Sequence, residues 1–593
     1  MSDYAVLTWS PQDDAALEPL SAARRELASL GWSRSNPQPG LEVWTAYPAP
    51  AVFLSPANNG LVIGQVIGDP GRSWTADPAA CARALCRTTW GRYVAVLRKP
   101  RGPAVAIYRD PSGGLDALSW RSGGLVIVAS DTDTLLEAAP PAGLAIDWPR
   151  LGMALRDSAA LAGHCPLSGV LTATPGALRD LETRAETMVW RPAAWARQGL
   201  ANTAETRQGL IDAVDQAVER QAGPGARVVA ELSGGLDSSI VGGALLKATD
   251  VRVVQWLHYF VEDSAGDERS YARAAAHHLG VTLTEASKST FGLNLGAMAQ
   301  AASAMRPSRA VIDSHYDIDM AERCSQRGAS HIFTGMGGDT IFMQGGSPLL
   351  AADAYWRRPI WRAGLGPALS VARHAKRSVW SVWRRAQLAR FSLGPTPHVS
   401  ETSHLSEAVR GAAPPRHAWL DDLDGVAPAK RRQIGHLAHQ LLVGGRSLRG
   451  RHVQIINPLL SQPVMETCLS LSAMAQTNGG DDRAMARQAF RDRLAPEIFA
   501  RRSKGDLGRH YGRAIAEDLA AVRDLLLDGA LAGAGLLDRQ PLEAMLTEER
   551  LIWQGPYREI VEMVLLEHWA RSWTSRLARL DRWPRDERLV EPA

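Results

Sequence analysis

The feature that most constrains the fold is the stretch ARVVAELSGGLDSS at residues 226–239, where an apolar run ends in a glycine-rich turn. The run has the composition of a buried strand, and a helix is expected from about Ser238 to Lys247. Such a turn gathers backbone N–H groups and hydroxyls at a helix N-terminus, which favours an anion by geometry and by dipole. The segment predicts a phosphate cradle, and a glycine turn with an Asp or Ser helix cap is the structural alternative.

Strand-like and helical segments continue to alternate after this turn. VRVVQWLHYF (251–260), VTLTEAS (281–287) and HIFTG (331–335) have the composition of strands, and DERSYARAAAHHLG (267–280) has that of a helix. Beyond residue 345 the patterns are mostly helical. This alternation predicts a parallel α/β sheet covered by helices and followed by a helical tail.

The first 190 residues have a different pattern. Short apolar runs separated by Gly, Pro, Asp and Asn predict an antiparallel sheet domain. Three helices are expected in and after it, at Ala15–Leu30, Asp77–Thr88 and Thr203–Gln221. We place a domain boundary near residue 200, which divides the chain into residues 1–200 and 201–593.

The overall composition excludes several classes of protein. With 45% hydrophobic and 22% charged residues, the chain is typical of a folded globular protein. Its 66 Lys plus Arg against 62 Asp plus Glu create no global field that would attract nucleic acid or a membrane. Five scattered cysteines predict neither a disulfide framework nor a zinc site. We find no signal peptide and no apolar stretch near the ~20 residues of a spanning helix, so we expect a cytoplasmic protein.

Two glycine-rich segments carry a resemblance to known enzymes. SGGLDSS (233–239) resembles the pyrophosphate-binding loop of N-type ATP pyrophosphatases, and TGMGGD (334–339) resembles the GxGGD element of asparagine synthetases and β-lactam synthetases. The resemblance implies an adenine-nucleotide α-hydrolase-like domain that cleaves ATP between its α- and β-phosphates and forms an acyl-adenylate. It also implies the nucleotide-binding residues, which are Leu232, Ser233, Gly234, Gly235, Asp237, Ser238 and Gly335.

Two carboxylates and one lysine are the predicted chemical groups. Polyphosphate needs Mg²⁺, which prefers carboxylate oxygens, so we expect Asp237 and Asp339 to be metal ligands and Asp339 also to be catalytic. DRAMAR (482–487) and RRSKG (501–505) resemble the C-terminal signature of asparagine synthetases, which implies that Lys504 lies against the reacting acyl-phosphate. A cation there would stabilise the charge that adenylation and aminolysis develop.

The first domain resembles a glutamine amidotransferase that has lost its reaction. YRDPSGG (108–114) and ASD (129–131) are similar to strands of the amidotransferase domains of asparagine synthetases. The nucleophile of those domains is a Cys at residue 2, but this chain has Ser2, and GQV (64–66) stands in place of their glutamine-binding Asn-Gly-Glu. A serine does not readily replace a thiolate. We therefore expect an Ntn-type antiparallel sandwich that does not hydrolyse glutamine.

A degenerate first domain is known in β-lactam synthetases and in lasso-peptide cyclases, and a length near 600 favours the cyclases. The resemblance implies an ATP- and Mg²⁺-dependent ligase that adenylates an Asp or Glu side chain of a leader-cleaved precursor peptide, whose N-terminal amine closes a macrolactam. It also suggests a leader peptidase and a leader-recognition protein as partners. A small-molecule amide ligase of β-lactam synthetase or ammonia-dependent asparagine synthetase type is the alternative. Met336 stands where those two families have Tyr and Glu, so the base that deprotonates the amine is unassigned.

The segment from Tyr355 to Ser400 is basic and rich in tryptophan. It contains nine Lys and Arg residues, no Asp or Glu, and four Trp residues. Such a segment could hold an acidic peptide, an anionic membrane surface or RNA, and the last of these makes an RNA-modifying loop enzyme a third hypothesis. The structural alternative is a helical insertion whose Trp side faces the core. We prefer a peptide partner and expect no nucleic acid.

Overall fold

The structure of the chain is a computed structural model. It describes residues 3–157, 161, 163–262, 266–288, 292–308, 314–356, 364–389, 401–412, 417–443, 447, 449–451, 453–501, 508–553, 555 and 557–582.

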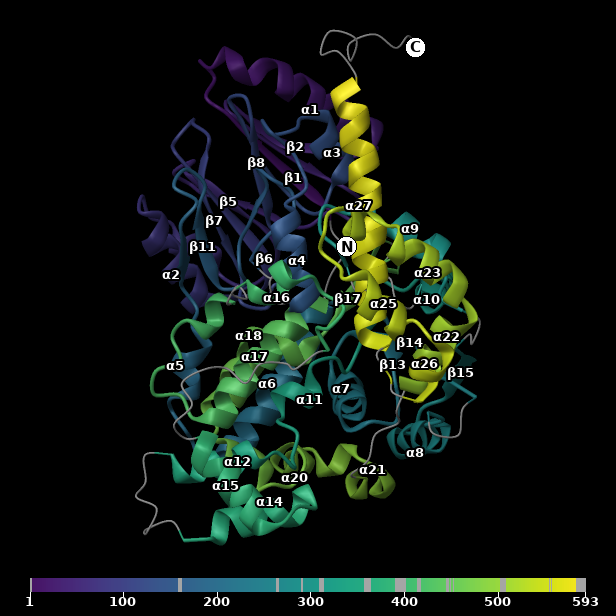
Figure 1. Cartoon of the computed structure of the whole chain (residues 1–593). Coiled ribbons are helices and arrows are strands. Elements are labelled where there is room, and N and C mark those ends of the chain that lie inside the picture. The colour runs from purple at the N-terminus through teal and green to yellow at the C-terminus, as the bar shows by residue number, and fades with distance from the viewer. Residues whose placement is uncertain are drawn as a thin grey trace.

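The strands before residue 190 form two six-stranded antiparallel sheets (Figure 1). One has the order β10-β8-β9-β1-β3-β2, with bounds Leu171–Thr172, Leu118–Ser122, Leu125–Ala129, Tyr4–Thr8, Leu41–Thr45 and Ser33–Gln38. The other has the order β12-β11-β7-β6-β5-β4, with bounds Glu186–Met188, Ala177–Asp180, Ala104–Arg109, Thr89–Arg98, Gly60–Gly68 and Val52–Leu54. Val6 and Val43 of the first sheet share a buried cluster with Ile63 and Val94 of the second, so the sheets pack face to face.

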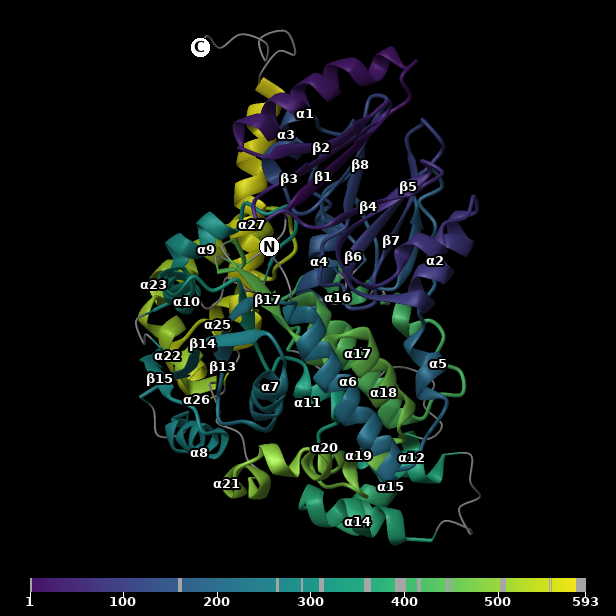
Figure 2. The same ribbon diagram turned by 180° about the vertical axis from the view of Figure 1, so that it is seen from behind.

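Helices cover the outer faces of these sheets and connect them to the rest of the chain (Figure 2). Their bounds are α1 Leu17–Ser29, α2 Pro78–Thr88, α3 Asp133–Ala138, α4 Trp148–Arg156, α5 Pro192–Ala196 and α6 Ala204–Ala222. The sequence patterns predicted α1, α2 and α6 to within two residues at each end. Asp77 caps α2 by accepting hydrogen bonds from two backbone N–H groups of its first turn, and Pro78 fits the first helical position.

The third sheet is parallel and has the order β15-β14-β13-β16-β17, with bounds Leu283–Ser287, Val251–Phe260, Ala226–Glu231, His331–Phe333 and Gln454–Ile456. Helices α6 and α7 (Leu236–Lys247) share a buried cluster with β13 on one face, and α10 (Ser314–Arg327) packs on the other. Burial on both faces explains why these strands are continuous apolar runs. The patterns did not indicate β17, because its three residues are too few to show a period.

The remaining described elements are short helices. They are α8 Arg269–Leu279, α9 Leu295–Ala301, α11 Gly338–Ile341, α12 Pro348–Tyr355, α14 Gly366–Ala375, α15 Val379–Ala389, α16 Glu407–Gly411, α17 Pro428–Val443, α18 Gln462–Ser470, α19 Ala473–Thr477, α20 Ala484–Ala489, α21 Pro496–Ala500, α22 Gly508–Glu517, α23 Leu519–Leu527, α24 Ala530–Gly533, α25 Arg539–Met545 and α26 Glu548–Trp553. Short 3-10 turns include η6 Arg449–Arg451 and η7 Pro458–Leu460. Within the described ranges, each helix is too short or too polar to cross a membrane. The five cysteines are free.

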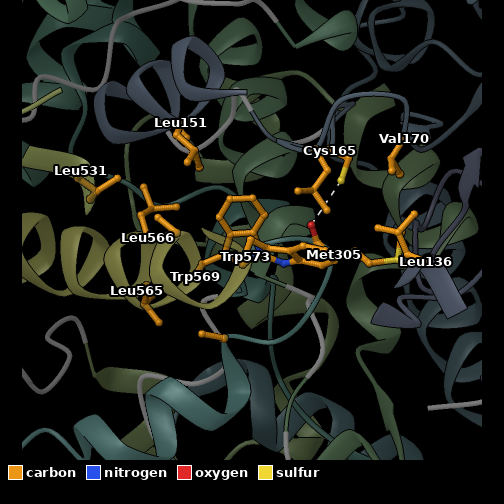
Figure 3. Close-up of a cluster of buried hydrophobic side chains, with 14 of the residues drawn as sticks. Leu136, Leu151, Cys165, Val170, Met305, Leu531, Leu565, Leu566, Trp569 and Trp573 are labelled. Atoms are coloured by element: carbon orange, nitrogen blue, oxygen red, sulfur yellow. Dashed lines mark hydrogen bonds between the residues drawn. The ribbon is translucent and has the colours of Figure 1, made fainter. Parts of the chain in front are cut away.

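The C-terminal helix α27 (Tyr557–Arg582) runs back along the first antiparallel sheet (Figures 1 and 2). Its Trp569 and Trp573 are fully buried, and both indoles donate a hydrogen bond to the carbonyl oxygen of Ala304, at 2.8 and 2.9 Å. Figure 3 shows the two rings beside Met305, whose carbonyl accepts from the Cys165 thiol at 3.4 Å. The same cluster contains apolar side chains of β1, so α27 joins the first sheet to the helical tail.

Candidate active site

Two glycine-rich loops meet at the carboxyl edge of the parallel sheet. Residues 232–235 follow β13 and residues 334–337 follow β16, and these two strands are paired in parallel. A Cβ added to Gly335 would lie 2.6 Å from the backbone nitrogen of Ser238. Only glycine allows the second loop to approach the first this closely. Glycine at position 335 therefore allows the two loops to touch.

The first loop presents donors at the start of α7. Gly235 is the N-cap of this helix, and the first-turn N–H groups face outward from it. The hydroxyl oxygens of Ser233 and Ser238 lie 3.0 Å apart, and Ser239 donates its hydroxyl proton to the carbonyl oxygen of Gly235 at 2.9 Å. Leu232 is fully buried in the core, and its backbone N–H donates to the carbonyl oxygen of Leu257 at 2.9 Å. The loop is thus held by its own polar groups with the helix N-terminus exposed to an anion.

A cavity of about 360 Å³ opens where the loops meet. Of the residues that sequence analysis assigned to nucleotide or metal, six line it: Ser233, Gly235, Asp237, Ser238, Gly335 and Asp339. Leu232 and Gly234 support the loop without lining the cavity. The volume lies within the usual range for a small-molecule pocket.

Arg483 connects the two predicted metal ligands. Its Nη1 donates to Oδ2 of Asp237 at 3.1 Å and to Oδ1 of Asp339, and its Nε donates to Oδ2 of Asp482 at 2.8 Å. Burial acts in the opposite direction, but these carboxylates raise the pKa of the guanidinium above its ordinary value. Arg483 lies in the segment DRAMAR (482–487), whose family resemblance implied no role for this residue. Its place at the start of α20 could not be read from that pattern.

The donor set fits a magnesium ion. The Asp237 and Asp339 carboxylates converge on one point, which the Arg483 guanidinium occupies. Among the described residues no group of three or more His, Cys, Asp or Glu side chains could hold a metal. Mg²⁺ is usually held by one or two protein carboxylates and completed by substrate phosphates and water, so two carboxylates beside a phosphate-binding helix start are a suitable set.

The cavity is also lined by charged side chains that the sequence patterns did not indicate. Glu231, the last residue of β13, pairs with Nη1 of Arg449 at 2.9 Å, and Arg449 also pairs with Asp317 at 3.1 Å. Glu268 pairs with Arg501. Among the described lining residues, four carboxylates face four guanidinium groups. The carboxylates are those of Glu231, Asp237, Glu268 and Asp339, and the guanidinium groups are those of Arg449, Arg483, Arg487 and Arg501.

Two residues named in the sequence analysis lie outside the described part of the chain, and a third lines the cavity without supplying a base. Lys504 and Ser2 fall outside the described residues, although Arg501 lines the cavity three positions before Lys504. Met336 lines the cavity, and its backbone N–H donates to the Thr334 hydroxyl at 3.0 Å. A thioether takes no proton, so Met336 supplies no base.

Three of the four tryptophans of the basic segment lie among the described residues, and Trp356 at its start is half-buried with the Arg431 guanidinium 5.2 Å from its ring centre. Trp383 on α15 packs against the buried cluster of α12 and α14, whereas Trp380 is 64% exposed. Another cavity, of about 400 Å³, lies beside this segment and is lined by Asp339 together with Arg377, Arg385 and Arg432. The segment therefore reaches the rim of the site with its arginines.

A comparison with family models finds one match over most of the chain. The model described as Asparagine synthase matches residues 209–571, a range that includes both glycine-rich loops and Arg483. No curated protein matches the chain.

Proposed function

We propose a specific reaction for this chain, which belongs to the asparagine synthase family, whose members are ATP-dependent amide ligases. In the proposed reaction the chain is a lasso-peptide cyclase. It activates an Asp or Glu side chain of a leader-cleaved precursor peptide with ATP, and the N-terminal amine of the same peptide attacks the activated carbonyl. The product is a macrolactam closed by an isopeptide bond.

The proposed chemistry has two steps. A carboxylate oxygen bonds to the α-phosphorus of ATP while the bond from that phosphorus to the β-phosphate oxygen breaks, and pyrophosphate leaves. The amine nitrogen then bonds to the acyl carbon, the acyl–oxygen bond breaks, and AMP leaves with the loss of one amine proton. Each ring consumes one ATP and lowers the peptide mass by one water.

Different residues would bind the phosphates, hold the metal and stabilise the developing charge. The first-turn N–H groups of α7 and the hydroxyls of Ser233 and Ser238 hold the phosphates. Asp237 and Asp339 would hold Mg²⁺, which neutralises phosphate charge when bound. Lys504 stabilises negative charge that develops in both steps. The single observation that carries the nucleotide assignment is the convergence of Asp237 and Asp339 beside the exposed helix N-terminus.

Two features bear on the substrates, the first on the source of the amine and the second on the molecule that carries the carboxylate. Ser2 and the Gly64–Val66 segment lack the chemistry of a glutaminase, so the amine must come from elsewhere than glutamine. Arg377, Arg385 and Arg432 line a cavity beside Asp339, where they suit an acidic peptide. We therefore treat residues 1–200 as a degenerate amidotransferase-like domain and residues 201–593 as the synthetase domain. A leader peptidase, a leader-recognition protein and a cytoplasmic location belong to the same proposal.

The experiment is single-turnover conversion of precursor peptides encoded next to this gene, each with a free N-terminal amine and an acidic residue several positions along. The expected result is a product lighter by one water, with one AMP and one pyrophosphate per ring. Pyrophosphate release with aspartate and ammonia, and no dehydrated peptide across these precursors, would replace this proposal with the small-molecule ligase. Salt-dependent binding of RNA without amide formation would favour the RNA-modifying alternative.

A further inference from the structure

A second cavity of about 360 Å³ lies between the antiparallel and parallel sheets. Strands β5 and β6 and the loop at residues 112–115 line one side of it, and β16, β17 and η6 line the other. Its polar lining groups are neutral amides, hydroxyls and an imidazole, apart from two guanidinium groups. Among the described residues no aspartate or glutamate lines it.

One of the two guanidinium groups forms no ion pair among the described residues, although the carboxylate of the buried Asp110 favours its charged form. Arg449 is paired with Glu231 and Asp317, whereas Arg92 of β6 forms no ion pair within the described part of the chain. Arg92 donates to the side-chain oxygens of Gln65 at 3.2 and 3.3 Å and of Gln454 at 2.6 Å, and to the carbonyl oxygen of Ile455 at 3.2 Å. Burial lowers its pKa to about 10, so the group is still charged at neutral pH.

The remaining titratable group of this cavity does not alter that charge. Burial, with Arg92 acting in the same direction, lowers the pKa of His331 to about 4, so the imidazole is neutral at pH 7. The stem of Arg92 is fixed by a close approach, since a Cβ added to Gly114 would lie 2.7 Å from its Cδ. The cavity therefore presents one preorganised positive charge among neutral acceptors. A carboxylate is a stronger partner for a guanidinium than a neutral amide.

A buried acceptor in the same cavity is also without a partner. Gln221 at the end of α6 is 2% exposed and lines the cavity. Its Oε1 accepts no hydrogen bond from any described residue. Buried polar atoms are normally satisfied, so an orphaned oxygen in a cavity wall indicates a ligand that supplies a donor such as an amide N–H. A carboxylate next to an N–H is the chemistry of an amino acid or of a peptide terminus.

The second cavity adjoins the cavity lined by Asp237 and Asp339, which we call the nucleotide cavity after the function proposed for it. The residues that line both are Met336, Gln440, Arg449, Ile455 and Asn457. Arg92 and Gln221 line only the second cavity. A carboxylate held by Arg92 is therefore not the one that reacts with ATP beside Asp237.

We infer that this cavity is a substrate-holding site in which Arg92 receives a second, non-reacting carboxylate of the peptide and Gln221 accepts the N–H beside it. A peptide C-terminus carries both groups. The identity of the ligand as a peptide rests on the proposed function, whereas the carboxylate site rests on the cavity itself. Arg92 and Gln221 are specificity-determining residues in this assignment.

The test compares two probes that differ in a single carboxylate. The full chain is titrated calorimetrically with the pentapeptide Gly-Gly-Glu-Gly-Gly as the free acid and as the C-terminal amide, each with α,β-methylene-ATP present. The free acid is expected to bind about tenfold or more tightly than the amide. Arg92→Met should abolish this difference and leave the affinity for the ATP analogue unchanged. Equal binding of the two peptides by the wild type, or no binding of either, would overturn the inference.

Two further variants separate a binding defect from a folding defect. Gln221→Met removes the orphaned oxygen at similar volume, so it should weaken the free acid several-fold without lowering the unfolding temperature. Arg121→Met, at an exposed position of β8, is the matched control and should change nothing. A free acid that binds Gln221→Met and Arg92→Met as it binds wild type overturns the site. Because no turnover is measured, the result is independent of whether the peptide is cyclised.

Free glutamine is the third probe, since it also carries a carboxylate beside a nitrogen donor. Displacement of the free-acid peptide by glutamine at a similar concentration, lost in Arg92→Met, would show an amino-acid site and overturn the assignment to a peptide terminus.

Discussion

The two adjoining cavities have the same volume, about 360 Å³ each, and opposite designs. In the nucleotide cavity the described carboxylates and guanidinium groups are equal in number, and several are already paired with one another, as Asp237 is with Arg483. In the cavity between the sheets, no described carboxylate lines the wall, and Arg92 forms no ion pair with a described residue. A cavity whose positive and negative side chains are equal in number can exchange its internal ion pairs for a highly charged ligand and its cation. A cavity with an excess of one positive charge suits a ligand with one negative charge.

The two cavities also differ in how the chain builds them. The nucleotide cavity is formed by loops that follow two paired strands, and each loop is a continuous segment of sequence. The other cavity joins residues far apart in the chain, such as Arg92 and Gln454. If the two designs differ in this way, changes at the charged groups of the nucleotide cavity should have the largest effects and a change at Ser2 in the first domain the smallest.

The largest effect is expected at Asp237. Asp237→Asn keeps the shape of the side chain and removes the charge that Arg483 and a bound Mg²⁺ would use. ATP-dependent pyrophosphate release should fall by about 10³-fold. Asp212→Asn on the exposed face of α6 is the control and should retain the wild-type rate. Wild-type turnover in Asp237→Asn would remove the nucleotide assignment.

Removal of the Arg483 guanidinium should lower the free energy of unfolding. Arg483→Met leaves the carboxylates of Asp237, Asp339 and Asp482 without their shared cation, and loss of one partner of a buried ion pair costs about 3 kcal/mol. The unfolding temperature should fall, and millimolar Mg²⁺ should recover more of it than it adds to the wild type. Arg220→Met, at an exposed position of α6, is the matched control. A variant that Mg²⁺ does not stabilise would argue against a metal at these carboxylates.

Lys504 is predicted to affect chemistry more than binding. Lys504→Ala should lower the rate of amide formation by about 10²-fold, with a smaller effect on ATP affinity, because the cation acts on charge that develops in the transition state. Lys504→Arg should rescue poorly, since a planar fork does not replace a compact ammonium. Lys247→Ala at the exposed end of α7 serves as the control. Full single-turnover activity in Lys504→Ala would make this residue an ordinary surface lysine.

The smallest expected effect is on glutamine. Glutamate formation from glutamine, with and without ATP, should equal a no-enzyme blank, because a serine at position 2 is a weak nucleophile without a base. Ser2→Ala should therefore leave every measured rate unchanged. A glutaminase rate that disappears in Ser2→Ala would show that the first domain is still catalytic.

The sequence was sufficient to indicate the parallel sheet and the antiparallel strands, because strand periods and glycine-rich turns are local signals. The proximity of Asp237 and Asp339 follows from the same signals, since adjacent parallel strands end at one edge. Long-range contacts carried no such signal. Arg483 reaches Asp339 from 144 positions away, and Arg92 meets Gln454 across 362 positions. The roles of Asp237, Asp339 and Lys504 stay predictions.

The C-terminal helix has a consequence for the order in which the protein is made. The outer core of the first sheet contains Leu7 and Trp120. Trp569 and Trp573 of α27, which Figure 3 labels, belong to the same buried cluster and close it. Translation produces the first sheet well before α27. A nascent chain must therefore keep this apolar face covered in another way, by chaperones or by transient collapse, until α27 leaves the ribosome. Chains truncated before residue 557 should accordingly enter inclusion bodies, although both cavities and their lining residues lie upstream of the cut.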